Sequence, residues 1–186
     1  MENQKIKNLL KYRPISIIGF MGVGKSTIGK RLSTELDMIF YDTDKEIEKK
    51  ERMTINDIFQ KFGENYFRKL EEGLIIKLLE KKENIVVSMG GGAFLNKLVR
   101  NKIKTSSISL WLDADINTIF SRIKKSRNTR PIAAKLNSKE EMENLLNKRK
   151  EIYSEADINI NISSLGKSEI LKLSKKKIIE YLEKKK

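Results

Sequence analysis

Short apolar runs alternate with longer amphipathic stretches along most of this 186-residue chain. The apolar runs are rich in β-branched side chains, which is typical of buried strands, and they cover residues 14–19, 38–41, 84–89, 107–112 and 157–162. Between them, apolar residues recur with helical spacing, which predicts helices over residues 25–36, 45–50, 64–81, 115–125, 138–154 and from 167 to the end. Strands that alternate with helices favour an α/β fold with one mostly parallel five-stranded sheet and helices on both faces.

Short sequence motifs predict where two of the helices begin and where a loop lies. Thr54–Asp57 has the form of a capping box and predicts the start of a helix, and Ser138–Glu141 does the same for a later helix. Residues 126–137 have little periodicity and contain Pro131, one of only two prolines, so we expect a loop there. Because we find no repeat and no linker, we expect residues 1–186 to form a single domain.

The chain has no histidine and no cysteine. This composition excludes disulfide bonds, catalysis by Ser-His-Asp or Cys-His groups, and the commonest zinc sites. Acid–base chemistry must therefore use Asp, Glu, Lys or Tyr. A bound metal ion should be one that prefers oxygen ligands, such as Mg²⁺.

The charge and hydropathy of the chain limit which kinds of molecule we expect it to bind. No apolar run of about 18 residues is present, and residues 1–14 lack the apolar core of a signal peptide. We therefore expect no membrane partner and a cytoplasmic location. The formal net charge of +14 has three interpretations: a nucleic-acid partner, anionic small molecules attracted to a basic site, or solvated helix faces rich in lysine.

The stretch from Gly19 to Ser26 has the pattern G-x-x-x-x-G-K-S, which forms phosphate-binding loops. It follows a predicted strand and precedes a predicted helix, as such a loop must. Its glycines allow backbone N–H groups to surround a phosphate, and the start of the helix adds positive potential. The Lys25 ammonium is expected on the β- and γ-phosphates, and the Ser26 hydroxyl can bind Mg²⁺. We expect ATP to contact Gly22, Val23, Gly24, Lys25, Ser26 and Thr27.

Charged residues beyond this loop have two interpretations each. Asp42 and Asp44 follow the second predicted strand, where ligands bind in open α/β sheets. They could serve a metal ion and a substrate hydroxyl, or Asp44 could simply cap the next helix. Arg68 precedes Glu71 by three residues on a predicted helix. It either binds an anion or forms a surface ion pair worth less than about 1 kcal/mol.

Three further features are candidates for ligand binding. Gly90, Gly91 and Gly92 directly follow a predicted strand, where either a ligand approaches the backbone or a simple turn forms. Arg127 and Arg130 lie in the predicted loop and could close over phosphates, or the loop is merely solvated. Arg149 lies on a helix rich in charged residues, where a solvated position is the plain alternative.

Taken together and in this order, these segments resemble the shikimate kinase family. The matching segments are IIGFMGVGKSTIGKRL, the D-T-D after the second strand, IFQKFGENYFRKLE, VVSMGGG, Arg130-Pro131 and KRKEIYSEAD, from residue 15 to about residue 157. The resemblance implies a three-layer P-loop kinase fold, related to nucleoside monophosphate kinases, with sheet order 2-3-1-4-5 and a mobile lid over residues 126–137. It implies ATP-dependent phosphorylation of the shikimate 3-hydroxyl, on the chorismate route to aromatic amino acids.

The resemblance also implies a shikimate-binding site. Asp44, Arg68 and Arg149 would bind shikimate, with Gly90, Gly91 and Gly92 lining the same site. Residues 44–72 would form its helical part. Because the chain has no histidine, Asp44 is the candidate base. The alternative is that Asp44 positions the hydroxyl more than it removes the proton, because phosphoryl transfer has a loose transition state.

On the phosphate side, the resemblance implies one Mg²⁺ per subunit, near Asp42 and Ser26. Arg130 would be the lid arginine that meets the phosphates, with Arg127 beside it. Lys25, Asp44 and Arg130 are thus the candidate catalytic residues. We expect a monomer that binds shikimate and ATP and no nucleic acid.

Two positions depart from the family pattern. The lid reads R-P-I-A where the family usually has R-P-L-L, which predicts looser packing over the site. Met89 precedes the three glycines where the family often has Thr, so a hydroxyl near the metal ion is missing, although Ser88 is adjacent. The adenine-contacting loop is expected near residues 161–166.

Two other functions are alternatives. Another small-molecule P-loop kinase, such as a gluconate kinase, would share the phosphate-binding loop and D-x-D but not F-R-x-x-E, G-G-G and R-x-x-x-Y together. A nucleic-acid-binding protein that uses ATP would suit the charge, but the chain has no basic strand rich in aromatics and no zinc pattern. Nucleic-acid binding should weaken steeply as salt is raised, whereas shikimate phosphorylation should persist.

Overall fold

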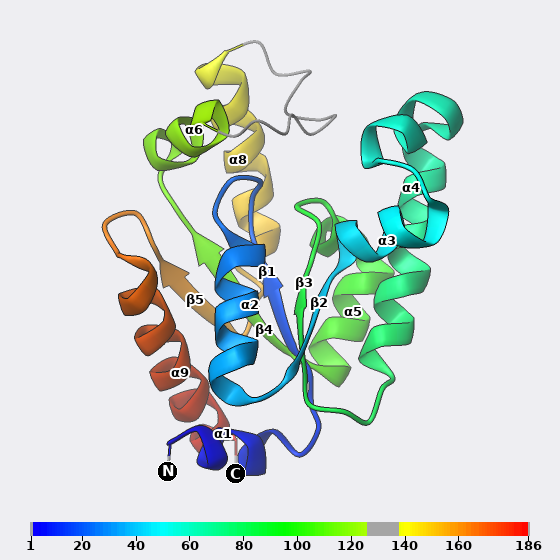
Figure 1. Cartoon of the computed structure of the whole chain (residues 1–186). Helices are drawn as coiled ribbons and strands as arrows, with labels where there is room; N and C mark the ends of the chain where they lie inside the picture. Colours follow the sequence, from blue (N-terminus) through cyan, green and yellow to red (C-terminus); the bar gives the residue numbers. More distant parts are fainter. Residues whose placement is uncertain (1, 126–137, 186) are drawn as a thin grey trace.

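The computed structural model describes residues 2–125 and 138–185. A parallel five-stranded sheet lies at the centre of this structure (Figure 1). The strands are β1 (Ile15–Ile18), β2 (Ile39–Asp42), β3 (Ile85–Ser88), β4 (Ile108–Asp113) and β5 (Ile158–Asn161). Their order is β2-β3-β1-β4-β5, and every neighbouring pair is parallel. The α/β class and the 2-3-1-4-5 order are therefore confirmed.

Burial along the strands explains why their apolar runs are almost continuous. All four residues of β1 and of β3 are buried, because each strand has a strand on either side and helices above and below. The edge strand β2 is less covered, and Ile39 at its start is 49% exposed. A central position in the sheet thus goes with unbroken burial, as expected for a parallel sheet.

Helices pack on the sheet in two groups. The first group is α1 (Glu2–Leu10), α2 (Lys25–Leu36) and α9 (Lys167–Lys184), which contact one another; the second includes α4 (Ile55–Leu79) and α5 (Lys97–Ser106). Ile17 of β1 approaches Gly29 of α2, whereas the preceding Ser16 hydroxyl bonds to Ser107 at the end of α5. Since successive strand residues point to opposite faces, the two groups cover opposite faces.

The remaining elements gather at the carboxyl ends of the strands. They are α3 (Thr43–Glu51), the short 3-10 helix η1 (Ala93–Leu95), α6 (Ile116–Lys125) and α8 (Lys139–Tyr153). Figure 1 shows the loop after β1 at the same end of the sheet as α3, α6 and α8, with both chain ends at the other. The predicted lid over residues 126–137, with Arg127 and Arg130, lies outside the described residues.

The structure corrects several predicted elements. Helices α1 and α5 were missed; each buries two residues, one helical turn apart: Ile6 and Leu10, and Val99 and Ile103. The two helices predicted before residue 81 are confirmed: they are the two parts of α4, which the non-helical Gly63 separates. The Thr54 capping box is confirmed, and Ser138 caps α8 as expected.

Helix α3 begins earlier than predicted, and this changes the role of the D-T-D sequence. Asp42 is the last residue of β2 and also the N-cap of α3, where its Oδ1 accepts a hydrogen bond from Lys45 N at 3.3 Å. Asp44 lies inside the first turn. The alternative that Asp44 caps this helix is therefore wrong, because Asp42 fills that position.

Within the described residues, no helix is both long and apolar enough to cross a lipid bilayer.

Candidate active site

The loop between β1 and α2 has the conformation of a phosphate-binding loop. Gly24 is the N-cap of α2 and has φ 96°, in the left-handed region that residues with a side chain rarely adopt. Lys25 is buried, and its Nζ donates to the carbonyl oxygens of Gly19 and Phe20, at 2.9 Å each. The predicted lysine therefore lies back over its own loop, where its ammonium can exchange these carbonyls for phosphate oxygens.

Oxygen-bearing side chains meet at the carboxyl ends of β2 and β3. Asp42 and Ser88 are register partners, so they lie side by side on adjacent strands. Ser88 Oγ lies 3.5 Å from Ser26 Oγ in the first turn of α2. Both Asp42 and Ser88 are buried. The structure thus brings together the two predicted metal-binding residues, Ser26 and Asp42, with Ser88 between them.

A turn of three glycines follows β3 and touches α3 and α4. The Thr43 hydroxyl accepts a hydrogen bond from Gly90 N at 3.0 Å, which ties the turn to the start of α3. A methyl group on Gly90 would collide with Glu71 Oε1 and come within 2.9 Å of Asp44 Oδ1. Only glycine allows both carboxylates to approach this turn so closely, so the simple-turn alternative is insufficient.

Arg68 is held on α4 by two carboxylates. Its Nη1 lies 2.6 Å from Glu71 Oε2, and its Nε and Nη2 lie 3.2 and 3.0 Å from Glu64 Oε1. The Glu71 side chain is 3% exposed and that of Arg68 is 25% exposed. The alternative of a surface ion pair is therefore wrong, because the chain buries one partner and half-buries the other.

Burial and charge act in opposite directions on Glu71. Burial raises the pKa of its carboxyl, the Arg68 guanidinium lowers it, and the negative charge of Asp44 raises it again, with a net increase above the ordinary value. One oxygen, Oε1, has no hydrogen-bond partner among the described residues. Carboxyls with a pKa raised in this way are typical of functional sites.

Arg149 approaches the same turn from α8. It is 8% exposed, its Nη1 donates to the Gly91 carbonyl at 3.3 Å, and its guanidinium carbon lies 5.4 Å from the centre of the Phe20 ring. Its Nε is buried and has no hydrogen-bond partner among the described residues. The alternative of a solvated helix face is therefore wrong.

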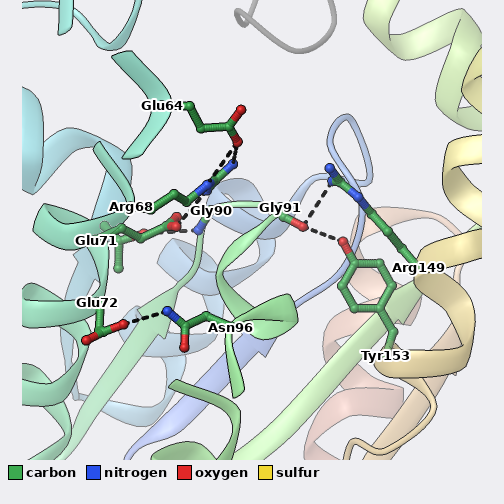
Figure 2. A network of polar contacts seen from close by, with 10 residues as sticks. Glu64, Arg68, Glu71, Glu72, Gly90, Gly91, Asn96, Arg149 and Tyr153 are labelled. Carbon is green, nitrogen blue, oxygen red and sulfur yellow. Dashed lines mark hydrogen bonds and ion pairs between the residues drawn. The ribbon is translucent and has the colours of Figure 1, made fainter. Parts of the chain in front are cut away.

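Figure 2 shows how these groups converge: Arg68 comes from α4, Arg149 and Tyr153 come from α8, and Gly90 and Gly91 lie between them. The turn is also next to the phosphate-binding loop, since a methyl group on Gly91 would lie 3.3 Å from Met21 N. The arrangement places two guanidiniums and the carboxylate of Asp44 beside the phosphate-binding loop. Such a site can hold a small anion that carries hydroxyl groups.

Three residues of this arrangement were absent from the predicted site: Thr43, Glu71 and Tyr153. The spacing of Glu71 from Arg68 and of Tyr153 from Arg149 put each pair on one helix face, which was a usable signal. Thr43 had no such signal, because its bond to Gly90 joins residues 47 apart in the sequence.

The loop expected near residues 161–166 is tied to the end of β4. Ile162 N donates to Asp113 O at 2.8 Å, and Asp115 N donates to Ser163 Oγ at 2.9 Å. Because β4 is the direct neighbour of β1, this loop reaches the same end of the sheet as the phosphate-binding loop.

Comparisons with known proteins agree with one another. The family model for shikimate kinase matches residues 21–183. A shikimate kinase from Bartonella henselae is 44% identical over 161 residues, covering 84% of this chain and 76% of that protein. One from Persephonella marina is 45% identical over 156 residues, covering 84% of this chain and 92% of that protein.

Solved structures give the same result. The shikimate kinase of Acinetobacter baumannii in complex with shikimate has a TM-score of 0.87 and 29% identity, over 94% of this chain and 97% of that one. A gluconokinase from Sinorhizobium meliloti reaches a TM-score of 0.55 at 16% identity, over 94% and 93% of the two chains. That second likeness extends to the fold alone.

Proposed function

The chain belongs to the shikimate kinase family and transfers a phosphoryl group from ATP to shikimate, and we propose that the residues around the Gly90–Gly92 turn hold the two substrates for this transfer. One observation carries the proposal: Arg68 and Arg149 reach this turn from different helices, next to the phosphate-binding loop.

On the ATP side, the phosphates bind the loop from Gly22 to Thr27 at the start of α2. The backbone N–H groups and the helix N-terminus attract negative charge. Lys25 leaves the carbonyls of Gly19 and Phe20 for the β- and γ-phosphates. The loop over residues 161–166 contacts the adenine, and Arg127 and Arg130, outside the described residues, contact the phosphates.

A Mg²⁺ ion fits the oxygen groups between α2, β2 and β3. Ser26, Asp42 and Ser88 offer hydroxyl and carboxylate oxygens, the ligands that Mg²⁺ prefers. Within residues 2–125 and 138–185 there is no cluster of three or more acidic side chains that could hold a metal alone. This suits Mg²⁺, which usually takes one or two protein ligands, water and substrate phosphates. When bound, the ion neutralises charge on the transferring phosphate.

Arg68 and Arg149 bind the shikimate carboxylate. The buried Nε of Arg149 lacks a hydrogen-bond partner among the described residues, and a carboxylate supplies one. Arg68 already has Glu71 at 2.6 Å, whereas its contacts with the half-exposed Glu64 are longer, at 3.0 and 3.2 Å. The substrate carboxylate therefore takes the place of Glu64 on Arg68, and Glu71 keeps the guanidinium aligned.

Asp44 accepts a hydrogen bond from the shikimate 3-hydroxyl and aims it at the γ-phosphate. A methyl group on Gly90 would lie 2.9 Å from Asp44 Oδ1, so this carboxylate is close to the Gly90–Gly92 turn. Phosphoryl transfer has a loose transition state, so positioning of the hydroxyl and neutralisation of charge contribute most to the rate. We further propose that the enzyme works as a monomer.

The first test is a coupled assay of ADP release with ATP and Mg²⁺, which compares shikimate, gluconate, a nucleoside monophosphate and no acceptor. We expect ADP release only with shikimate. The binding roles are tested by Arg68→Lys and Arg149→Lys, which keep the charge but lose the bidentate geometry. Each should raise the shikimate KM at least about tenfold, with the ATP KM changed less than about threefold. Unchanged shikimate KM values would refute the assigned carboxylate site.

A further inference from the structure

Tyr153 takes no part in the substrate contacts proposed above, yet its side chain lies between α8 and the glycine turn. Its hydroxyl donates a hydrogen bond to the Gly91 carbonyl, the same oxygen that accepts from Arg149 Nη1 (Figure 2). Only 1% of the residue is exposed, so the ring is part of the core and not a substrate ligand. We propose that Tyr153 is a positioning residue for shikimate binding, because it holds the Gly91 carbonyl and thereby leaves Arg149 available to the substrate.

The tyrosine ring is fixed at both ends. Tyr153 follows Arg149 by one helical turn on α8, so both side chains point to the same turn. On its other side, the ring packs against Trp111 of β4, with ring centres 6.0 Å apart and planes at 42°. A buried aromatic ring held in this way has one position for its hydroxyl, and that position is the Gly91 carbonyl.

The hydroxyl is a donor at every working pH. Burial raises the pKa of Tyr153 above the ordinary value of 10.0, against a smaller lowering by Arg149. The phenol therefore keeps its proton, and its hydrogen bond to Gly91 O does not titrate near neutral pH.

Tyr153 and Arg149 make unequal contacts with the same oxygen. The Arg149 bond is 3.3 Å long, beyond the usual range for an N–H···O bond. The Tyr153 hydroxyl is a second donor to this oxygen. While Tyr153 satisfies the carbonyl, Arg149 can give up its weak bond at little cost. Without the hydroxyl, this carbonyl depends on Arg149, and the substrate must then compete with the protein backbone for the guanidinium.

The proposal rests on the assigned role of Arg149 and is tested with Tyr153→Phe. We expect the shikimate KM to rise roughly tenfold, the scale of one lost hydrogen bond, while kcat and the ATP KM stay within about twofold. The effect falls on KM because Arg149 holds the carboxylate equally in the ground state and the transition state. A shikimate KM within about twofold of the wild type would overturn the proposal.

Tyr181→Phe is the matched control. The Tyr181 hydroxyl also donates to an internal acceptor, Asp157 Oδ1, but on α9 away from the turn. It should lower the Tm as Tyr153→Phe does and leave both KM values unchanged. If it raised the shikimate KM as much as Tyr153→Phe, the positioning role would be refuted.

A second variant replaces Tyr153 by 4-aminophenylalanine, which keeps an N–H donor at the para position. A shikimate KM near that of the wild type supports the donor role, even if the Phe variant proves too unstable to assay. A raised KM with a Tm near that of the wild type overturns it. Arg149→Lys distinguishes a failure of the role proposed for Tyr153 from a failure of the role proposed for Arg149. An unchanged shikimate KM in Arg149→Lys would refute the role of Arg149 itself.

Discussion

The carboxyl of Glu71 lies where the protein leaves little water to solvate a charge. It meets Arg68 on one side and Asp44 near Gly90 on the other, and its Oε1 has no hydrogen-bond partner within the described residues. Burial, partly offset by Arg68, raises its pKa above the ordinary value of 4.5. If Arg68 binds the substrate as proposed, Glu71 supports that binding at some expense of stability.

Glu71→Gln tests this balance. Because the folded chain binds a proton at Glu71 more readily than the unfolded chain, the contribution of Glu71 to stability is greatest below pH 4.5 and falls as the pH rises through the raised pKa. Gln does not titrate. We expect the variant to exceed the wild type in free energy of unfolding at pH 7, and the difference to vanish below pH 4.5.

The same substitution should raise the shikimate KM roughly tenfold, because Arg68 loses a charge-assisted bond. Urea denaturation at several pH values, with initial rates at pH 7, measures both effects. A variant that is less stable than the wild type by the same margin at every pH would contradict the burial argument.

Asp44→Asn keeps the size of the side chain but removes its charge and its capacity as a base. We expect kcat to fall by a factor of roughly 10² or more, and the ATP KM to change less than about threefold. Asp42→Asn is the companion variant, since it should raise the Mg²⁺ concentration needed for half-maximal rate. Steady-state kinetics in ATP, shikimate and Mg²⁺ distinguish the two. Equal losses of turnover and ATP affinity in Asp44→Asn would exclude the assigned role.

At the scale of elements, α4 contains a break at Gly63, where the sequence pattern predicted the junction of two helices. Gly63 has φ 81° and ψ 170°, a region that is open to glycine and costly for any other residue. No atom outside its neighbours lies within 4 Å of a methyl group built there. Any cost of a side chain at Gly63 is therefore backbone strain and not a steric clash.

Gly63→Ala and Gly73→Ala form a matched pair within α4. Gly73 is helical and also has nothing within 4 Å of an added methyl group. We expect Gly63→Ala to lower the free energy of unfolding by about 1–3 kcal/mol and Gly73→Ala to raise it by about 0.5–1 kcal/mol. Denaturation of both variants decides this. A stable Gly63→Ala protein would show that α4 can run straight through this position.

Element-level expectations succeeded where periodicity was strong. The five strands were predicted from their short apolar runs, and the α2, α6, α8 and α9 helices were predicted from helical patterns and, for α8, from its capping residues. Helices α1 and α5 were missed, and the start of α3 was misplaced by two residues. The burial of Arg149 and the partial burial of Arg68 could not be predicted from the sequence. Charged residues on helices are usually solvated, and only the tertiary fold covers these two.

At the scale of the whole molecule, α1 and the candidate active site lie at opposite ends of the sheet. Figure 1 shows α1 and both chain ends at the amino-terminal end of the strands, far from the phosphate-binding loop. Ile6 and Leu10 of α1 are fully buried against this end. The phosphate-binding motif, in contrast, could be recognised from the sequence alone, since its residues are contiguous.

Ile6→Ala should therefore weaken the fold without touching the site. We expect a loss of about 2–5 kcal/mol in the free energy of unfolding, with both KM values unchanged in the folded protein. Leu98→Ala is the control, because Leu98 is 62% exposed and its truncation should cost less than about 0.5 kcal/mol. Thermal denaturation and steady-state kinetics test both variants. A changed shikimate KM in Ile6→Ala would show that α1 influences the distant site.

The position of the chain ends has a practical consequence. An affinity handle, a fluorescent reporter or a solid support attached at either end would project from the face opposite the substrates. A layer of the enzyme coupled in this way to a sensor surface would present every reaction centre outward, to the flowing solution. A second catalyst fused at the same end would share the scaffold without screening the first from its reagents.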